Sequence, residues 1–156
     1  MGEMNEYSKI KEVAIRSPLQ GFVSEEKLSR EWEPLRFHAK PHLEKAIVEF
    51  NYFRNLLSEE EIEIVDLPSS DLLTIDSIYT RDSILISKAG LILCNMGRES
   101  RTPEANENYR TLAKKGYEIA GQIKAPGTLE GGDFIWIDDN HAAVGLGPRT
   151  NLDGIE

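Results

Sequence analysis

Hydrophobic residues in the first half of the chain follow patterns that predict a strand, a long helix and a second strand. Residues 12–16, EVAIR, have the composition of a short strand that stops at a Ser-Pro pair. Between Pro41 and Leu57 hydrophobic residues recur every three or four positions, which predicts an amphipathic helix with Pro41 at its first position. EIEIVDLP then alternates as a strand does and ends at Pro68. The segment FVSEEKLSREWEPLRFHAKPH is irregular, and we expect a loop or a loose helix there.

The second half of the chain predicts hairpins that alternate with helices. IYTRDSILISKAGLILCNM has the pattern of two strands that turn at residues 88–90. The following helix is predicted with Thr102 as its N-cap, Pro103 at its first position and Gly116 at its end, before a strand at 117–119. FIWIDDNHAAVGLG predicts another hairpin, and RTNLDGIE has the pattern of a capped helix start. The order strand, strand, helix, strand therefore begins to recur, and we expect the chain to stop within such a unit.

Size and charge narrow the classes of function. With 156 residues, 40% of them hydrophobic, the chain is predicted to form one folded domain over residues 1–156. Its net charge of −9 opposes binding to phosphate backbones, so we expect a small polar or cationic ligand rather than nucleic acid. No stretch has the roughly 20 apolar residues that cross a bilayer, and the single cysteine fits a reducing compartment. We therefore expect a soluble, cytoplasmic protein without a membrane partner.

Four polar clusters interrupt the hydrophobic pattern, each at a predicted strand end or in the loop beside it, where rigid scaffolds display functional side chains. The clusters are Asp76, Arg81 and Asp82 in DSIYTRD, Arg98 and Arg101 in GRESR, Glu130 and Asp133 in LEGGD, and Arg149 and Asn151 in GPRTN. Carboxylates pair well with a planar guanidinium, and arginines pair well with a carboxylate on the same ligand. Together the clusters predict a site for an arginine-like zwitterion.

Each cluster also has a structural interpretation. A glycine pair before a strand, as in LEGGD, is typical of a bulge or of a tight entry that needs positive φ. Asp82 has the position of a turn cap, and Arg101 or Arg149 would equally satisfy a helix terminus or a surface ion pair. Taken one residue at a time, these interpretations stay open.

The histidines and the cysteine have no spacing that predicts a metal site. His38 and His42 flank a proline near a helix start, and His141 falls in a predicted hairpin turn. Cys94 lies in an apolar strand without a cationic neighbour that would lower its pKa, so we expect a buried thiol of low reactivity. No metal or other cofactor is expected.

The motifs DSIYTRD, GRESRTPE, APGTLEGGDF and VGLGPRTNLDGIE, in this order and with these gaps, resemble the guanidino-group-modifying enzymes. This family comprises dimethylarginine dimethylaminohydrolases, arginine deiminases and amidinotransferases. A first strand ending at RSP and a helix carrying NYFRNLL extend the resemblance over nearly the whole chain. It implies an α/β propeller (pentein) of five ββαβ units around a central substrate channel, of which this chain is the N-terminal part, about half.

The resemblance also implies a chemistry and a role for each candidate residue. A cysteine thiolate attacks the guanidinium carbon to give a covalent thiouronium adduct, and a histidine acts as general acid and then as base. By resemblance, Glu130 is the catalytic acidic residue beside that histidine, and Asp82 holds the guanidinium nitrogens. Asp76 is a further substrate contact, and Arg101 and Arg149 hold the α-carboxylate of a small guanidino substrate.

Two departures from the family pattern shape the expectations. No residue matches the family cysteine or histidine, so we expect this chain to be inactive alone and to be completed by a C-terminal half or a complementary subunit. Arg81 stands where dimethylarginine hydrolases commonly have an acidic residue, which leaves the substrate open between arginine and a methylated arginine. Amidino transfer to an amine and a noncatalytic arginine-binding or assembly module also stay open. An interrupted propeller leaves apolar flanks, which predicts a homo-oligomer.

Overall fold

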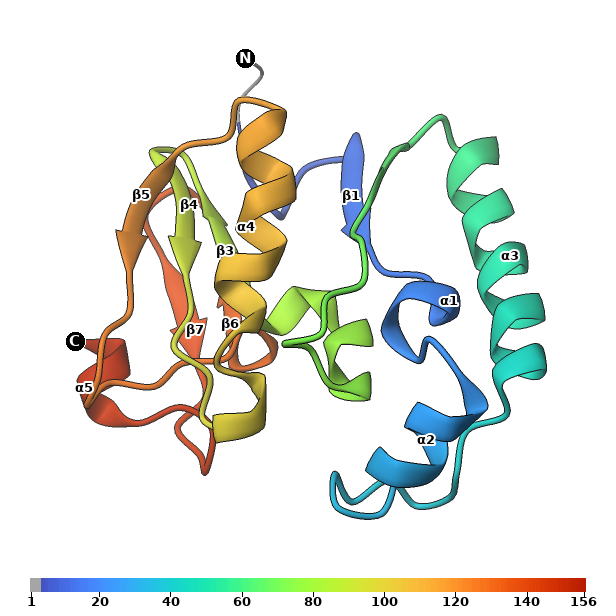
Figure 1. The fold of residues 1–156 in the computed structure, drawn as a ribbon. Coiled ribbons are helices and arrows are strands. Elements are labelled where there is room, and N and C mark those ends of the chain that lie inside the picture. The colour runs from blue at the N-terminus through green and yellow to red at the C-terminus, as the bar shows by residue number, and fades with distance from the viewer. Residues whose placement is uncertain (1–3) are drawn as a thin grey trace. The chain divides into compact units, whose positions relative to one another are not determined.

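The computed structural model describes residues 4–156 and divides into two compact units (Figure 1). The N-terminal unit is Ile10–Tyr79, and the C-terminal unit is Thr80–Glu156 together with residues 4–9. The prediction of one domain over residues 1–156 stays a prediction. None of the helices over the described residues is both long and apolar enough to span a bilayer.

The N-terminal unit joins two parallel strands through three helices. Its elements are β1 (Glu12–Ile15), α1 (Pro18–Gly21), α2 (Glu25–Glu31), α3 (Leu43–Glu59), β2 (Glu63–Asp66) and the 3₁₀ helix η1 (Ile75–Ile78). Glu12 pairs with Glu63 and Ile15 with Asp66 across the two strands. The predicted strands and long helix are confirmed. Pro41 precedes α3 instead of occupying its first position, because His42 is the N-cap.

The segment expected to be a loop or loose helix contains the regular helix α2. The hydroxyl of Ser24 accepts a hydrogen bond from the backbone N–H of Lys27 at 3.1 Å and so caps the helix. Leu28 is fully buried in a core with Phe22, Leu35 and Ile75, which fixes α2 against η1. One hydrophobic residue in the core therefore stabilises a helix whose sequence shows no clear period.

The C-terminal unit contains one complete strand-strand-helix-strand (ββαβ) motif. Its first elements are the 3₁₀ helix η2 (Thr80–Asp82), β3 (Ile84–Ser87), β4 (Gly90–Leu93), the 3₁₀ helix η3 (Glu99–Arg101), α4 (Glu104–Lys114) and β5 (Ile119–Gln122). The sheet order is β3-β4-β5, with β3 and β4 antiparallel and β4 and β5 parallel. Along the chain α4 connects the two parallel strands β4 and β5, and Figure 1 shows it running alongside the sheet. The predicted hairpin, helix and ββαβ order are thus confirmed.

The boundaries of these elements differ from the predicted ones in three places. Residues before Ser83 form η2 rather than strand, because the Ser83 hydroxyl donates to the carbonyl of Thr80 at 3.1 Å. Pro103, not Thr102, is the N-cap of α4, and the Thr102 hydroxyl instead donates to the carbonyl of Glu99 at 2.9 Å. The last strand lies at Ile119–Gln122, two residues later than expected, and the stop at Gly116 is confirmed by its φ of 89°.

The start of a second strand-strand-helix-strand motif follows β5 in the C-terminal unit. The remaining elements are the 3₁₀ helix η4 (Gly131–Asp133), β6 (Phe134–Trp136), β7 (Ala142–Val144) and α5 (Leu152–Ile155). β6 and β7 form the predicted antiparallel hairpin, and Asn151 caps α5 by accepting from the N–H of Gly154 at 2.9 Å. Both predictions are confirmed.

The core of the C-terminal unit contacts the loop that carries Glu130. Leu85 from β3 and Leu129 belong to one buried cluster with Cys94 and Met96. Leu129 is 3% exposed, so the residue next to Glu130 is held by packing. The loop is therefore part of the core and the position of Glu130 is fixed.

Candidate functional site

Four of the five predicted site residues lie together in the C-terminal unit. Arg101 Nη1 donates to Asp82 Oδ2 at 2.8 Å and lies 3.6 Å from Glu130 Oε2. Arg149 Nη1 donates to both carboxylate oxygens of Glu130, at 2.9 and 3.2 Å. Residues separated by up to 67 positions in sequence thus form one network of charges. We refer to Asp82, Arg101, Glu104, Glu130 and Arg149 as the charge cluster.

Glu104 is a member of this cluster that the motifs did not identify. It is completely buried at the start of α4, and its two carboxylate oxygens accept from Nε and Nη2 of Arg101, each at 2.8 Å. Burial opposes the charge of Arg101, but the hydrogen bonds and charges of Glu104 and Asp82 outweigh it and raise the pKa of Arg101 above its usual range. Arg101 is therefore a permanent, immobilised cation.

Glu130 is held from several directions. It is 5% exposed, and its Oε1 accepts from the backbone N–H of Gly97 at 3.1 Å as well as from Arg149. Its own N–H donates to the hydroxyl of Thr150 at 3.2 Å, and that hydroxyl donates to Asp133 Oδ2 at 2.7 Å. Both the carboxylate and the backbone of Glu130 are therefore fixed before any ligand binds.

Asn151 ties the segment after Arg149 to the loop before Glu130. Its Oδ1 accepts from the N–H of Thr128 at 2.8 Å and from that of Gly154, its Nδ2 donates to Pro126 O at 2.9 Å, and its own N–H donates to Thr128 O at 3.1 Å. The two parts of the chain that carry Arg149 and Glu130 are thus held together by one side chain and its backbone.

The glycine pair in LEGGD allows close approach to the Thr80–Asp82 segment. A Cβ on Gly131 would overlap the carbonyl oxygen of Arg81, and one on Gly132 would lie 2.7 Å from Asp82 Oδ1. Neither glycine has a positive φ, so the tight-entry interpretation by positive φ is wrong here. The absence of two β-carbons instead lets Asp82 and Glu130 come from segments packed directly on each other.

Arg81, which departs from the family pattern, has its bonds outside the charge cluster. Its Nη2 donates to Glu6 Oε2 at 3.0 Å and to the carbonyl of Phe134 at 3.1 Å. Burial raises the pKa of Glu6, and the charge of Arg81 opposes that shift. Arg81 thus fastens the N-terminal segment and the start of β6 to η2.

Asp76 is the predicted site residue that lies in the N-terminal unit. It is 5% exposed and sits in η1, where its carbonyl accepts from the N–H of Tyr79 at 3.0 Å. The backbone carbonyl of neighbouring Ser77 accepts from Nη1 of Arg16 at 2.7 Å, and Arg16 is itself 1% exposed. This segment is therefore rigid, and the role of Asp76 as a substrate contact stays a prediction.

The histidines and acidic residues do not gather into a metal site. Over residues 4–156 no group of three or more His, Cys, Asp or Glu side chains is placed to hold a metal ion. His141 lies in the β6–β7 turn, as predicted, and its Nδ1 is 2.8 Å from Asp138 Oδ1. Its hydrogen-bond partner is thus a neighbour in the turn rather than Glu130.

Cys94 is a buried thiol beside the cluster. It is 3% exposed, and burial raises the pKa of its thiol to about 12. The positive charge of Arg81 acts in the opposite direction, so the expectation that no cation acts on Cys94 is wrong, although burial outweighs that cation. At neutral pH Cys94 is therefore protonated and a poor nucleophile.

This burial predicts a specific pH dependence of stability. Above about pH 9.0 the unfolded thiol loses its proton, whereas the folded thiol keeps it up to about pH 12. Because the unfolded state then binds fewer protons, the wild type should lose stability relative to Cys94→Ala as the pH rises through this window. Urea unfolding of both proteins between pH 8 and 11 measures the difference, and parallel pH profiles would contradict the assignment.

Comparison with known proteins identifies the family to which this arrangement belongs. Residues 24–156 match the family model described as "N,N dimethylarginine dimethylhydrolase, eukaryotic". The chain belongs to the dimethylarginine dimethylaminohydrolase family. The resemblance of its motifs to guanidino-group-modifying enzymes is therefore confirmed.

Two curated relatives are bacterial dimethylarginine dimethylaminohydrolases. The protein from Pseudomonas aeruginosa is 30% identical over 115 residues, which are 74% of this chain and 44% of the relative. The protein from Streptomyces coelicolor is 32% identical over 81 residues, which are 52% of this chain and 31% of the relative. The chain thus spans less than half the length of these relatives.

Solved structures of the family have the same fold. A dimethylarginine dimethylaminohydrolase adduct with 4-chloro-2-hydroxymethylpyridine matches with a TM-score of 0.73 and 28% identity, over 93% of this chain and 52% of that one. A mutant of the Pseudomonas aeruginosa enzyme complexed with citrulline matches with a TM-score of 0.73 and 27% identity, over 93% of this chain and 53% of that one. The N-terminal domain of a cyanobacterial arginine dihydrolase matches with a TM-score of 0.70 and 16% identity, over 93% of this chain and 52% of that one. At this identity the match supports the fold alone. The predicted α/β propeller is confirmed.

Proposed function

We propose that this chain supplies the guanidino-binding part of a hydrolase that cleaves a guanidino C–N bond of arginine or a methylated arginine. The observation that carries the proposal is the charge cluster in a chain of the dimethylarginine dimethylaminohydrolase family. Its carboxylates are the groups that a guanidinium pairs with best. Fixed carboxylates also orient a guanidinium carbon, which is a poor electrophile because its charge is delocalised.

The balance of charge in the cluster supports binding of one more cation. Asp82, Glu104 and Glu130 contribute three negative charges, and Arg101 and Arg149 contribute two positive ones. Arg101 is 4% exposed and Glu104 is completely buried, so these two have little freedom to rearrange. Arg149 is 31% exposed and Asp82 is 20% exposed. A substrate guanidinium would balance the excess negative charge, and Arg149 is the cation that can turn towards a substrate carboxylate.

The proposed reaction needs a nucleophile that Cys94 does not provide. Its thiol keeps its proton up to about pH 12 and lies in a hydrophobic core. In the proposal, the cysteine that forms the thiouronium adduct and the histidine that transfers its proton come from the part of the family fold that this chain does not span. Within this chain, Glu130 is the acidic residue that orients the guanidinium, Asp82 holds its nitrogens, and Asp76 is a further contact.

One observation favours the noncatalytic alternative. Both carboxylates assigned to the substrate already accept hydrogen bonds from arginines of the chain itself. If these ion pairs are purely structural, the chain retains the fold of the family as an arginine-binding or assembly module, or as a scaffold alone. Binding measurements separate these possibilities, because a purely structural network would not bind free guanidino compounds.

Replacement of Glu130 tests the proposal. Glu130→Gln keeps the shape of the side chain but removes the charge that a guanidinium recognises, so affinity for L-arginine and for N-methylated arginines should fall at least about tenfold, or 1.4 kcal/mol. Isothermal titration calorimetry measures this affinity. The matched control is Glu118→Gln, the same chemical change at an exposed glutamate outside the cluster.

Two further outcomes have defined meanings. Equal affinity in the wild type and Glu130→Gln would contradict the assignment of Glu130, and no binding of any guanidino compound by a folded wild type would favour the scaffold. A polypeptide that supplies the C-terminal half of the family fold is then added, and citrulline is assayed with and without an amine acceptor. Citrulline formation supports hydrolysis, whereas modification of the amine would favour amidino transfer.

A further inference from the structure

Glu104 belongs to the charge cluster, yet it is closed off from solvent. Its side chain is 0% exposed at the start of α4, so a ligand cannot touch it in this structure. Burial of an ion pair is weak evidence for a stabilising role, because hydrophobic residues of similar volume often serve stability equally well. The charge of Glu104 is therefore better explained by a role in the neighbouring site than by stability alone.

The contacts of Arg101 show how Glu104 acts on the site. The guanidinium of Arg101 is planar, and its Nε and Nη2 both donate to Glu104, each at 2.8 Å. This side-on pairing fixes the plane of the guanidinium and directs Nη1 towards the other two carboxylates. Nη1 donates to Asp82 Oδ2 at 2.8 Å and lies 3.6 Å from Glu130 Oε2. Glu104 thus sets the position of the group that contacts both Asp82 and Glu130.

Glu104 also decides the net charge of the charge cluster. Asp82 and Glu130 carry two negative charges. Arg101 and Arg149 carry two positive ones, so these four residues together are neutral. Glu104 adds the fifth charge and makes the charge cluster negative by one. A cationic ligand therefore meets an excess negative charge that Glu104 supplies.

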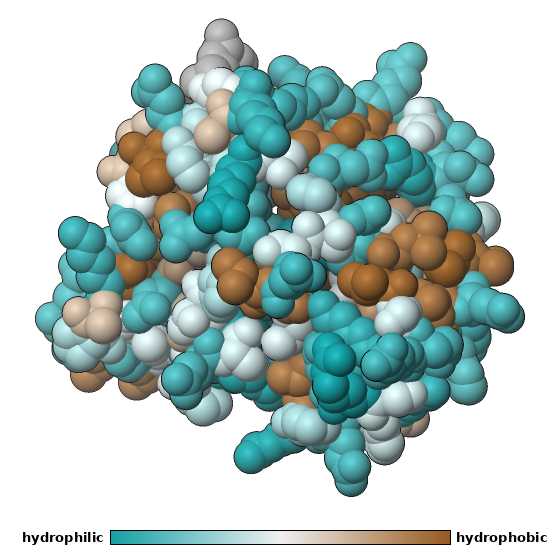
Figure 2. All heavy atoms as spheres, viewed as in Figure 1, coloured by the Kyte–Doolittle hydropathy of each residue, from teal (hydrophilic) through white to brown (hydrophobic). Residues whose placement is uncertain are grey.

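Burial gives this charge more weight than a charge at the surface. Figure 2 shows hydrophilic residues over most of the visible face of the molecule, where water and salt screen each charge. Glu104 and Arg101 are 0% and 4% exposed, so their charges act through protein rather than through water. The net charge of −9 for the whole chain is therefore a poorer guide to cation binding than this one buried carboxylate.

We propose that Glu104 is a positioning residue of the guanidino site and gives that site its preference for a cation. It acts through Arg101, whose guanidinium it neutralises and holds in place, so that the carboxylates of Asp82 and Glu130 keep negative charge for a ligand. The preferred ligand is a guanidino compound rather than its neutral ureido counterpart. This inference rests on the function proposed above and adds to it a residue that does not contact the ligand.

L-Arginine and L-citrulline test this role, because they share the α-amino acid end and differ in the charge of the other end. Titrations followed by NMR measure the dissociation constant of each, and the wild type should bind L-arginine more tightly. Glu104→Gln removes one charge and should raise the dissociation constant of L-arginine about tenfold, while that of L-citrulline changes less than about twofold. A purely structural role would weaken both ligands equally.

Two further variants separate the charge of Glu104 from its hydrogen bonds. Glu104→Asp keeps the charge but shortens the side chain, so stability should fall while the preference for L-arginine stays within about twofold of the wild type. The double variant Arg101→Met/Glu104→Met removes both buried charges and leaves the charge cluster negative by one. Hydrophobic replacement of a buried pair is compatible with folding. The double variant should therefore keep the preference that Glu104→Gln loses, even if loss of Arg101 weakens both ligands alike.

Glu107→Gln is the matched control. It makes the same chemical change on the same helix, at a glutamate whose partner Arg110 is 70% exposed. The preference for L-arginine over L-citrulline should stay within about twofold of the wild type. Circular dichroism shows which variants are folded.

Three results would overturn the proposal. One is a folded Glu104→Gln protein that loses affinity for both ligands to the same extent, which would make Glu104 purely structural while the proposed function stands. Another is loss of the preference for L-arginine in Glu104→Asp or in the double variant, and this result decides the matter where Glu104→Gln does not fold. The third is a folded wild type that binds neither ligand or does not distinguish them, which would overturn the proposed function together with this inference.

Discussion

Replacement of Glu104 by alanine should lower the free energy of unfolding by about 3–5 kcal/mol, since it leaves a buried guanidinium without its principal partner. Glu104 accepts two hydrogen bonds from Arg101, each at 2.8 Å, and neither side chain is more than 4% exposed. Arg101 cannot lose its proton to escape the penalty, because its pKa lies above the usual range even though burial opposes its charge. Asp82 remains as a partner and accepts from Nη1 of Arg101 at 2.8 Å.

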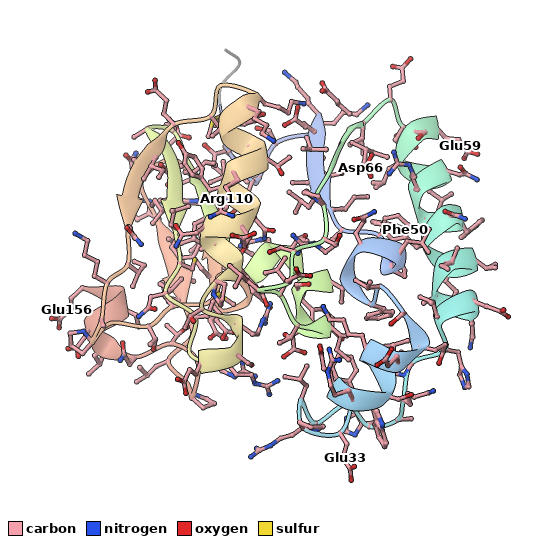
Figure 3. All side chains as sticks on the ribbon, viewed as in Figure 1. Glu33, Phe50, Glu59, Asp66, Arg110 and Glu156 are labelled. Atoms are coloured by element: carbon pink, nitrogen blue, oxygen red, sulfur yellow. The ribbon has the colours of Figure 1, made fainter. Side chains whose placement is uncertain are left out.

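A second glutamate on the same helix provides the control. Glu107 also lies in the first turn of α4, so replacing either residue removes the same favourable interaction with the helix dipole. Its partner is Arg110, labelled in Figure 3, whose side chain is 70% exposed. The side chain of Glu107 is itself 9% exposed, but its removal leaves no buried cation, so Glu107→Ala should cost clearly less than Glu104→Ala. Urea unfolding gives both values, and equal losses would mean that the buried pair adds nothing to stability.

Gly131→Ala should destabilise the protein by about 2–3 kcal/mol and weaken guanidino binding. The new methyl group would overlap the backbone oxygen of Arg81, and its nearest side-chain atom would be Arg81 Nη1 at 2.5 Å. The backbone there has little room to move, because the Ser83 hydroxyl bonds Thr80 O and itself accepts from Asn108 Nδ2 at 2.8 Å. Relief of the overlap would move Asp82 away from Glu130.

Gly147 offers a matched substitution without an overlap. A Cβ at this position meets no atom within 4 Å, and its φ is not positive. Gly147→Ala should therefore change stability by less than about 0.5 kcal/mol. Thermal unfolding compares the two variants, and calorimetry compares their affinity for arginine. A Gly131→Ala protein with wild-type stability would show that the contact between η4 and η2 is loose.

Local sequence patterns predicted much of the fold, because periodicity, alternation and capping depend on residues that are close together in sequence. The periodicity of α3, the alternation in β2 and the hairpin patterns of β3–β4 and β6–β7 survive in the structure, and α5 has the capped start that its sequence predicts. Helix α2 was not predicted as a regular element, because its stability depends on Leu28 in a core built from distant residues. The start of α4 shifted by one residue because the Thr102 hydroxyl bonds within η3 instead of capping the helix.

The motifs named four candidate residues that lie together in the structure, but they did not predict the network of contacts among them. The sequence did not indicate Glu104 as a site residue, because a glutamate three residues after an arginine is equally typical of an exposed pair on a helix. Its complete burial comes from the tertiary packing of α4. Arg81 and Asp82 are neighbours in sequence, yet they bond to different parts of the C-terminal unit. Consecutive side chains in a 3₁₀ helix point about 120° apart, so Arg81 and Asp82 face different surroundings.

The four hydrogen bonds of Asn151 also have a dynamic consequence. They join α5 to the loop at residues 126–128, which leads directly into Leu129 and Glu130. Segments linked in this way open together, so opening of α5 releases the loop as part of the same local unfolding event. The lifetime of the charge cluster therefore depends on α5 at its edge as well as on its own ion pairs.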